Sequence, residues 1–108
     1  MKSFLDRDSN LLANSVEFVG NSHFNVRVRN YGKGSTKILI DVTEIACHRT
    51  SKARAIKIAC RQARNVGAVD MDFSTIRDDE IDKKVTMWDG TKTVVHVRQT
   101  CFAFDSGL

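Results

Sequence analysis

Apolar and polar residues alternate at every second position along much of the first half of the chain, which is the pattern of half-buried β-strands. The alternation covers residues 16–19, 24–29 and 37–45, and polar or glycine-containing stretches separate these segments. The second segment shows it best, with the apolar residues Phe24, Val26 and Val28. We therefore predict three consecutive strands, preceded at residues 6–14 by a short helix or turn.

The spacing of apolar residues changes to that of a helix between residues 51 and 65. One narrow face of this helix carries Ile56, Ala59, Cys60 and Ala63. Ser51 can cap the first N–H groups with its hydroxyl, and Gly67 suits the end of the helix. We expect this amphipathic helix to pack on a sheet through its apolar face.

Strand patterns return after the helix, and they complete the predicted fold. Residues 69–74 alternate again, residues 77–82 are expected to form an acidic loop, and Asp89-Gly90 is a strong hairpin signal. The return strand is expected to run from about Thr91 to Phe104. The result is an α+β fold, a mostly antiparallel sheet of five to six strands with one helix on one face, approximately βββαβββ.

The composition describes an ordinary globular chain. It has 108 residues, of which 42% are hydrophobic and 28% charged, so we expect a single domain over residues 1–108. Apolar runs are too short for a membrane span, and acids near the N-terminus argue against a secretion signal. Three cysteines without framework spacing suit reduced thiols, so the expected location is cytoplasmic.

The net charge of +4 is distributed very unevenly along the chain. Residues 45–69 hold six basic residues and no acidic one, whereas residues 70–82 hold six acids and one arginine. If the two blocks lie side by side they neutralise each other. If they face apart, each is a candidate contact surface.

The basic block gives the predicted helix a face of a single sign, formed by Arg54, Lys57, Arg61 and Arg64. Like charges at this spacing cost an isolated helix about 0.2–0.5 kcal/mol per pair. An acidic partner outside the protein, such as nucleic acid phosphate, would compensate that cost. The alternative interpretation is a solvated face that the acidic block balances.

Two further charged segments are candidate binding residues. Arg27 and Arg29 point to the polar side of the second strand and could extend the basic surface. In the acidic block, Asp78, Asp79 and Glu80 could imitate phosphates toward a basic channel of a partner.

Three more specific motifs are alternative interpretations of the sequence. The segment TEIACHRTSKARAIKIACRQ is similar to a helix-turn-helix, but Thr50 stands at the usual turn glycine and Arg49 at a normally apolar position. Zinc binding is disfavoured because Cys47 and His48 are adjacent rather than separated. The pair Asp70 and Asp72 could belong to a metal-dependent nuclease, or it could be solvent-facing strand acids.

No remaining pattern predicts catalysis. Thiol–imidazole pairs can be drawn from Cys47, Cys60 or Cys101 with any of three histidines, without a spacing that favours one. Trp88 is expected to pack beside the hairpin turn, with an exposed interface aromatic as the alternative. We expect no catalytic residue, no metal and no cofactor.

In element order over residues 37–101, the chain resembles small inhibitor proteins of phages and mobile elements of the anti-CRISPR kind. The resemblance is one of architecture, a compact sheet with one helix laid across it, and it transfers no functional residue. It implies a non-enzymatic inhibitor that engages a host protein or nucleoprotein complex through charged surfaces. The alternative is a direct DNA- or RNA-binding module that uses helix 51–65. A homodimer is a further candidate assembly, and the edge of the long C-terminal strand is a candidate dimer or partner seam.

Overall fold

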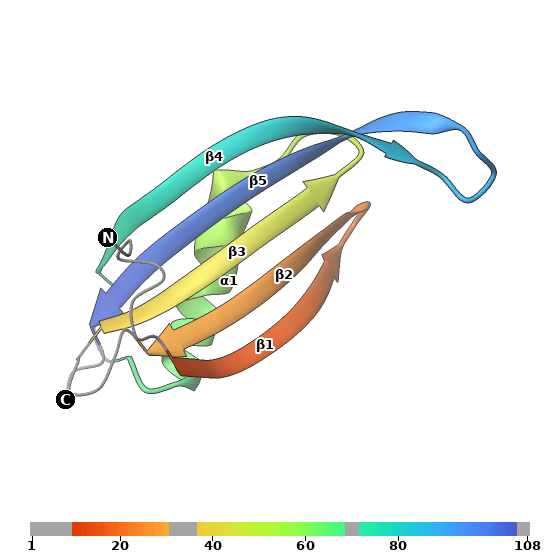
Figure 1. Cartoon of the computed structure of the whole chain (residues 1–108). Helices are drawn as coiled ribbons and strands as arrows, with labels where there is room; N and C mark the ends of the chain where they lie inside the picture. Colours follow the sequence, from red (N-terminus) through yellow and green to blue (C-terminus); the bar gives the residue numbers. More distant parts are fainter. Residues whose placement is uncertain (1–9, 31–36, 69–71, 106–108) are drawn as a thin grey trace, which may run out of the picture.

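The computed structural model describes residues 10–30, 37–68 and 72–105. Over these residues the chain forms five strands and one helix (Figure 1). In chain order they are β1 (Asn10–Val19), β2 (Ser22–Asn30), β3 (Lys37–Ala46), α1 (Lys52–Asn65), β4 (Phe73–Thr86) and β5 (Lys92–Asp105). The α+β class, the antiparallel sheet and the single helix are confirmed, whereas the described order is βββαββ rather than βββαβββ.

The five strands form one sheet in the order β1-β2-β3-β5-β4, and every neighbouring pair is antiparallel. β1, β2 and β3 follow one another as a meander. The chain then crosses the sheet through α1 and returns as the β4–β5 hairpin, with β5 placed beside β3. β5 therefore lies inside the sheet, and the expected dimer seam along it is wrong. Among the described strands, the two edges belong to β1 and β4.

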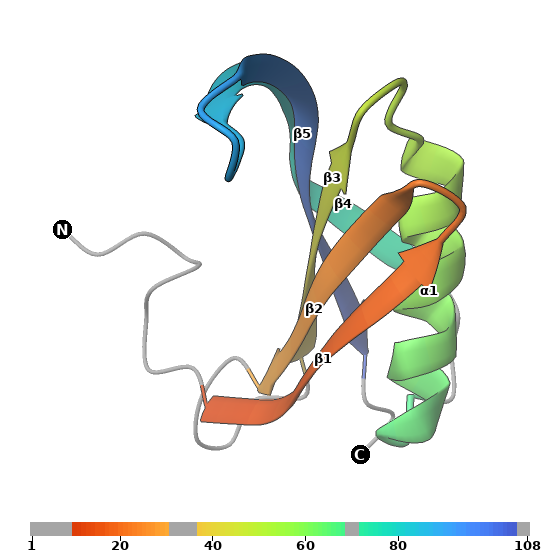
Figure 2. The ribbon, with the colours of Figure 1, turned by 90° about the vertical axis from the view of Figure 1, so that its right-hand side faces the viewer.

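α1 packs on one face of the sheet, which we call the helix face, and the opposite side is the far face (Figure 2). The main core lies between sheet and helix. The sheet contributes Phe24, Val26, Val28, Ile38, Ile40, Val42, Phe102 and Phe104. The helix contributes Ala55, Ile58, Ala59, Ala63. Alanines at three of these four positions let the helix backbone approach the sheet closely.

The helix is rotated relative to its predicted apolar face. Ala59 and Ala63 are buried as expected, but Ile56 and Cys60 are only half-buried and Ala55 and Ile58 take the inner positions. The predicted start is confirmed, because the Ser51 hydroxyl accepts a hydrogen bond from the Arg54 backbone N–H at 3.2 Å. Gly67 ends the helix with a positive φ of 96°, a conformation that favours glycine.

Two expectations about secondary structure and one of the alternatives are wrong. Residues 10–14, expected in a helix or turn, belong to β1. The helix-turn-helix is also absent from the described residues, since the segment before α1 is the end of β3. Residues 77–82 are not a loop but the middle of β4. β4 is an edge strand exposed along almost its whole length, so it has no buried face to impose alternation, and charged side chains suit such an edge.

The hairpin at Asp89-Gly90 is confirmed. The Met87 N–H donates to the Thr91 carbonyl at 2.7 Å, and Gly90 has a φ of 87°. The Asp89 carboxylate accepts the side-chain and backbone hydrogen bonds of Thr91, and these bonds lower the pKa of Asp89. Trp88 does not pack beside the turn, because it is 96% exposed.

β4 and β5 extend beyond the other strands. The last pair between β3 and β5 is Ala46 with His96, so residues 83–95 project as an arm. Figure 2 shows the tip of this arm bending away from α1, on the side of the far face. In the described part of the chain, no helix is long and apolar enough to cross a membrane.

Candidate nucleic-acid interface

The outward face of α1 carries the predicted basic side chains, but the fold leaves only some of them available. Lys57, Arg61 and Arg64 are exposed on the side of the helix away from the sheet. Lys57 and Arg64 have no ion-pair partner within the residues that the structure describes. These two cations are the available part of the predicted surface.

Arg54 has a structural role instead. Its Nη2 donates to Oε2 of Glu44 at 3.0 Å, and the Glu44 side chain is only 1% exposed. The second carboxylate oxygen of Glu44 accepts the Ser51 N–H at 2.8 Å. The Arg54 guanidinium also lies 6.0 Å from the centre of the Phe24 ring, a cation–π distance. Arg54 therefore neutralises a buried acid at the start of the helix.

Glu44 is a residue that the sequence analysis missed. It occupies the position on β3 that follows Ile40 and Val42 on the buried side. An acid at the buried phase of an alternating strand is a signal that a cation lies nearby, because a buried charge needs a partner. The apolar alternation of residues 37–45 predicts the strand but does not by itself indicate a role for this acid.

Arg61 has an acidic partner, as Arg54 does, but its side chain stays exposed. It forms an ion pair with Glu17 of β1, whose carboxylate also accepts a hydrogen bond from the Gln62 amide at 3.3 Å. The Arg61 side chain nevertheless stays 54% exposed. An exposed pair of this kind is worth little in water, so Arg61 can exchange Glu17 for a phosphate at small cost.

Arg27 and Arg29 do not extend the basic surface of α1, which corrects that prediction. Their neighbours Phe24, Val26 and Val28 face the helix, so the two arginines lie on the far face. Arg27 is exposed. Arg29 is 8% exposed, and its Nε lies 2.8 Å from the Asp41 carboxylate.

The acids of β4 are divided between the two faces of the sheet, and basic partners from the same chain compensate them. Asp78 and Glu80 lie on the helix face and pair with Arg98 at 2.7 and 3.0 Å. Asp79 lies on the far face and pairs with Arg77 at 2.7 Å. The acidic segment therefore does not form one continuous acidic surface. Its first residue, Asp70, lies outside the described residues.

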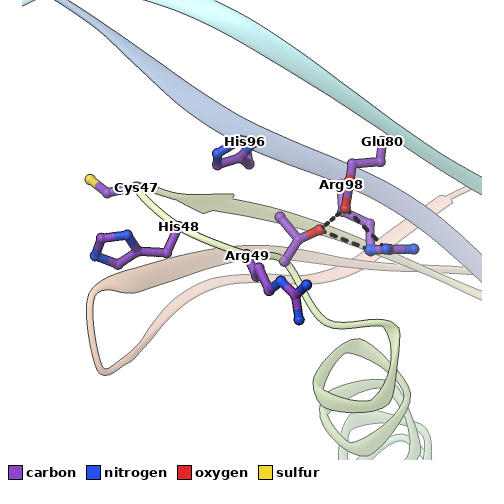
Figure 3. A pocket seen from close by; sticks show the side chains of 7 residues that line it. Cys47, His48, Arg49, Glu80, His96 and Arg98 are labelled. Atoms are coloured by element: carbon purple, nitrogen blue, oxygen red, sulfur yellow. Dashed lines mark hydrogen bonds and ion pairs between the residues drawn. The ribbon is translucent and has the colours of Figure 1, made fainter.

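Arg98 joins β4 and β5 to the loop that precedes α1 (Figure 3). Besides Asp78 and Glu80, it donates to the Thr50 hydroxyl at 3.0 Å, and that hydroxyl donates to Glu80. The residues around it line a pocket of about 570 Å³: Cys47, His48, Arg49, Thr50, Glu80, His96 and Arg98. Lys52, at the start of the helix, lies 3.8 Å from Asp78. The network fixes the N-terminal end of α1 against the hairpin.

Polar and charged side chains form most of the lining of this pocket. The His96 Nδ1 lies 2.6 Å from the Asp82 carboxylate, which orients the ring. Figure 3 shows the Cys47 side chain turned away from His96, so the two do not form a thiol–imidazole pair. Among the residues that the structure describes, no group of three or more histidines, cysteines and acids could hold a metal ion.

The three cysteines are free thiols in different environments. Cys47 is exposed, Cys60 is half-buried, and Cys101 is buried on the far face with Leu39 and Ala103. Burial, together with the neighbouring Asp41 charge, raises the pKa of the Cys101 thiol to about 12. Cys101 is therefore a neutral buried side chain at ordinary pH.

Comparisons with known proteins give no match: no family model, no curated protein and no solved structure matches the chain.

Proposed function

We propose that this chain is a non-enzymatic binding protein that contacts the phosphate backbone of a nucleic acid through the outward face of α1. The observation that carries the proposal is the row of Lys57, Arg61 and Arg64, exposed and without an acid between them on the helix. Phosphates supply the opposite charge that Lys57 and Arg64 lack among the described residues, and arginine can hold them bidentately.

The dimensions of the row suit a nucleic acid strand. Seven residues separate Lys57 from Arg64, which corresponds to about 10 Å along a helix axis. One strand of duplex DNA places a phosphate about every 3.4 Å along its axis. The row is therefore long enough to reach more than one phosphate of the same strand.

Binding of duplex DNA and duplex RNA at several salt concentrations tests the proposal. Fluorescence anisotropy with labelled 20-base-pair duplexes gives the dissociation constant directly. Three phosphate contacts predict a log–log salt slope of about −2.7 on DNA, or about 40-fold weaker binding at 200 mM than at 50 mM salt. A salt-independent signal, or no binding at 50 mM salt, contradicts it.

The decisive variant reverses the two cations that have no partner. K57E/R64E should weaken duplex binding at least 10-fold at 50 mM salt, since it converts two attractions into repulsions. The matched control is K84E/K92E, which changes the net charge equally at two exposed lysines of the β4–β5 hairpin. If the control weakens binding as much as the test variant, net charge rather than the helix face is responsible.

A second candidate function is engagement of a protein in a nucleic-acid-handling complex, as an inhibitor of the kind that the architecture resembles. The observation that favours it is the edge of β4, a 14-residue strand with no further strand beside it in the described part of the chain. An exposed edge can receive a strand from a partner or from a second copy. Backbone amide exchange that slows along β4 in a partner complex would support this function.

A further inference from the structure

The far face is ordered into rows that cross all five strands. The pairing register places five residues side by side in an apolar row: Phe18, His23, Ile45, Val97 and Ile81. Two residues further along each strand lies a polar row: Val16, Asn25, Thr43, Gln99 and Asp79. The next is an arginine row: Asn14, Arg27, Asp41, Cys101 and Arg77. Successive rows are about 7 Å apart, and each is about 19 Å long.

We propose that these three rows form a binding platform for a single-stranded nucleic acid. The inference goes beyond the proposed function because the platform lies on the opposite side of the sheet from the outward face of α1. The two surfaces can therefore be tested separately.

The apolar row is open to solvent at its two ends, whereas Val97 within it is only 8% exposed. Phe18 is 77% exposed, an unusual position for a phenylalanine, and its ring centre lies 6.0 Å from that of His23. Ile81 at the other end of the row is 51% exposed. Open aromatic rings on a sheet can stack unpaired bases, whose faces are not available in a duplex.

The polar row adds groups that hydrogen-bond to base edges. Asn25 and Gln99 carry amides and Thr43 a hydroxyl, each able to donate and accept. They lie one row from the rings, within reach of the edge of a base stacked there. Amides and hydroxyls of this kind read the exposed edges of single-stranded bases.

The arginine row supplies the positive charge that the backbone of such a strand requires. Arg27 is exposed and has no ion-pair partner among the described residues. Arg77 donates to both Asp79 and Gln99 and stays 45% exposed. The two arginines line a hollow of about 240 Å³, whose other lining residues are Arg29, Asp41, Thr43, Gln99 and Thr100. The arginine row matches the charge of a phosphate backbone, and the rings of the apolar row match the faces of bases. Together they favour a nucleic acid strand over a purely apolar partner.

The β4–β5 arm gives the platform a border. Its tip bends away from α1, to the side of the far face, beyond the apolar row (Figure 2). A flexible single strand can follow a face bordered in this way.

Binding of a labelled dT12 strand and of a 12-base-pair duplex tests the inference at 50 mM salt. F18A should weaken dT12 binding about 10-fold and leave duplex binding within twofold, because it removes one stacking surface. F18W should keep dT12 binding, since it retains an aromatic ring. K57E/R64E should do the reverse, losing the duplex and keeping dT12, so failure of either proposal is seen separately.

Two further variants, one control and one test, make the experiment specific. W88A removes another highly exposed aromatic ring, which lies at the hairpin tip outside the three rows, and should leave dT12 binding unchanged. R27A should weaken dT12 binding, and its log–log salt slope should decrease by the contribution of about one phosphate contact. Circular dichroism confirms folding of every variant, and Phe18 is exposed enough for F18A to fold.

Three results would overturn the inference. The first is wild-type affinity of F18A and R27A for dT12, and the second is no binding of dT12 at 50 mM salt. The third is a wild-type dimer by light scattering that F18A converts to a monomer, which would assign the far face to a second copy of the chain.

Discussion

The basic helix α1 and the acidic strand β4 carry charges of opposite sign, yet the fold uses them differently. Each acid in the middle of β4 has a cationic or imidazole partner in the same chain, whereas Lys57 and Arg64 on α1 have none among the described residues. The reason is geometric. A strand has a neighbour about 5 Å away whose side chains meet its own, while the outward face of a surface helix has nothing opposite it. Charge in a sequence therefore becomes a binding surface only where no neighbour compensates it.

The strongest test of this comparison is at Glu44, the acid that removes Arg54 from the basic surface. Glu44→Ala should lower the free energy of unfolding by about 3 kcal/mol, because it leaves the Arg54 guanidinium and the Ser51 N–H without their partner. Urea denaturation followed by circular dichroism measures the loss. Glu44→Gln, which keeps the shape and one acceptor, should lose less. A loss below about 1 kcal/mol in the alanine variant would show that Arg54 is held loosely and belongs to the surface after all.

Arg98 allows a test of the acids of β4, because it pairs with Asp78 and Glu80. Arg98→Met should cost about 2 kcal/mol of unfolding free energy, because hydrogen bonds to Asp78, Glu80 and Thr50 are lost together from a side chain that is 20% exposed. The matched control is Arg77→Met, whose exposed pair with Asp79 should be worth less than about 1 kcal/mol. Equal losses in the two variants would contradict a special role for the Arg98 network.

The parts of the fold that were predicted correctly depend on local signals. The cap at Ser51 and the hairpin at Asp89-Gly90 each need only neighbouring residues, and alternation marks β2 and β3 because each has one buried face. The middle of β4, residues 77–82, was missed because an edge strand exposed on both faces has no reason to alternate. Trp88 was misplaced because a tight turn does not by itself provide a surface for a ring to pack on.

The candidate site was harder to predict because its decisive contacts are distant in sequence. The pair of Arg61 with Glu17 joins residues 44 positions apart, and Arg98 meets Thr50 across 48 positions. The first pair depends on how α1 lies over β1, and the second on the placement of β5 beside β3. The sequence pattern leaves both arrangements open. Residue spacing alone therefore identified the cations but not which of them keep their charge available.

The Asp41–Arg29 pair can be tested through Cys101, because the charge of Asp41 contributes to the raised pKa of the Cys101 thiol. Burial and the Asp41 charge raise the folded-state pKa of Cys101 to about 12 from an ordinary value of 9.0. Between these values the unfolded chain loses a proton that the native chain keeps. The stability that depends on the neutral thiol is therefore complete below pH 9 and decreases by about 1.4 kcal/mol per pH unit up to about pH 12.

Urea denaturation of the wild type and of Cys101→Ala at pH 8, 9.5 and 10.5 measures this effect. The alanine variant carries a constant offset for the lost side chain, and its stability should decline less steeply with pH. Cys47→Ala, at an exposed thiol, is the control and should follow the wild type. Parallel pH profiles for the wild type and Cys101→Ala would contradict the raised pKa.

The smallest expected effect comes from Asp79, whose pair with Arg77 is exposed on both sides. Asp79→Asn should change the free energy of unfolding by less than about 0.5 kcal/mol, because water already solvates both charges. Thermal unfolding at 150 mM salt checks the stability. The same substitution releases Arg77 on the far face, so affinity for dT12 should rise by about threefold or less while duplex affinity stays unchanged. A large loss of stability would mean that compensation along β4 holds the strand in place, and that its acids were selected for folding rather than for keeping one surface basic.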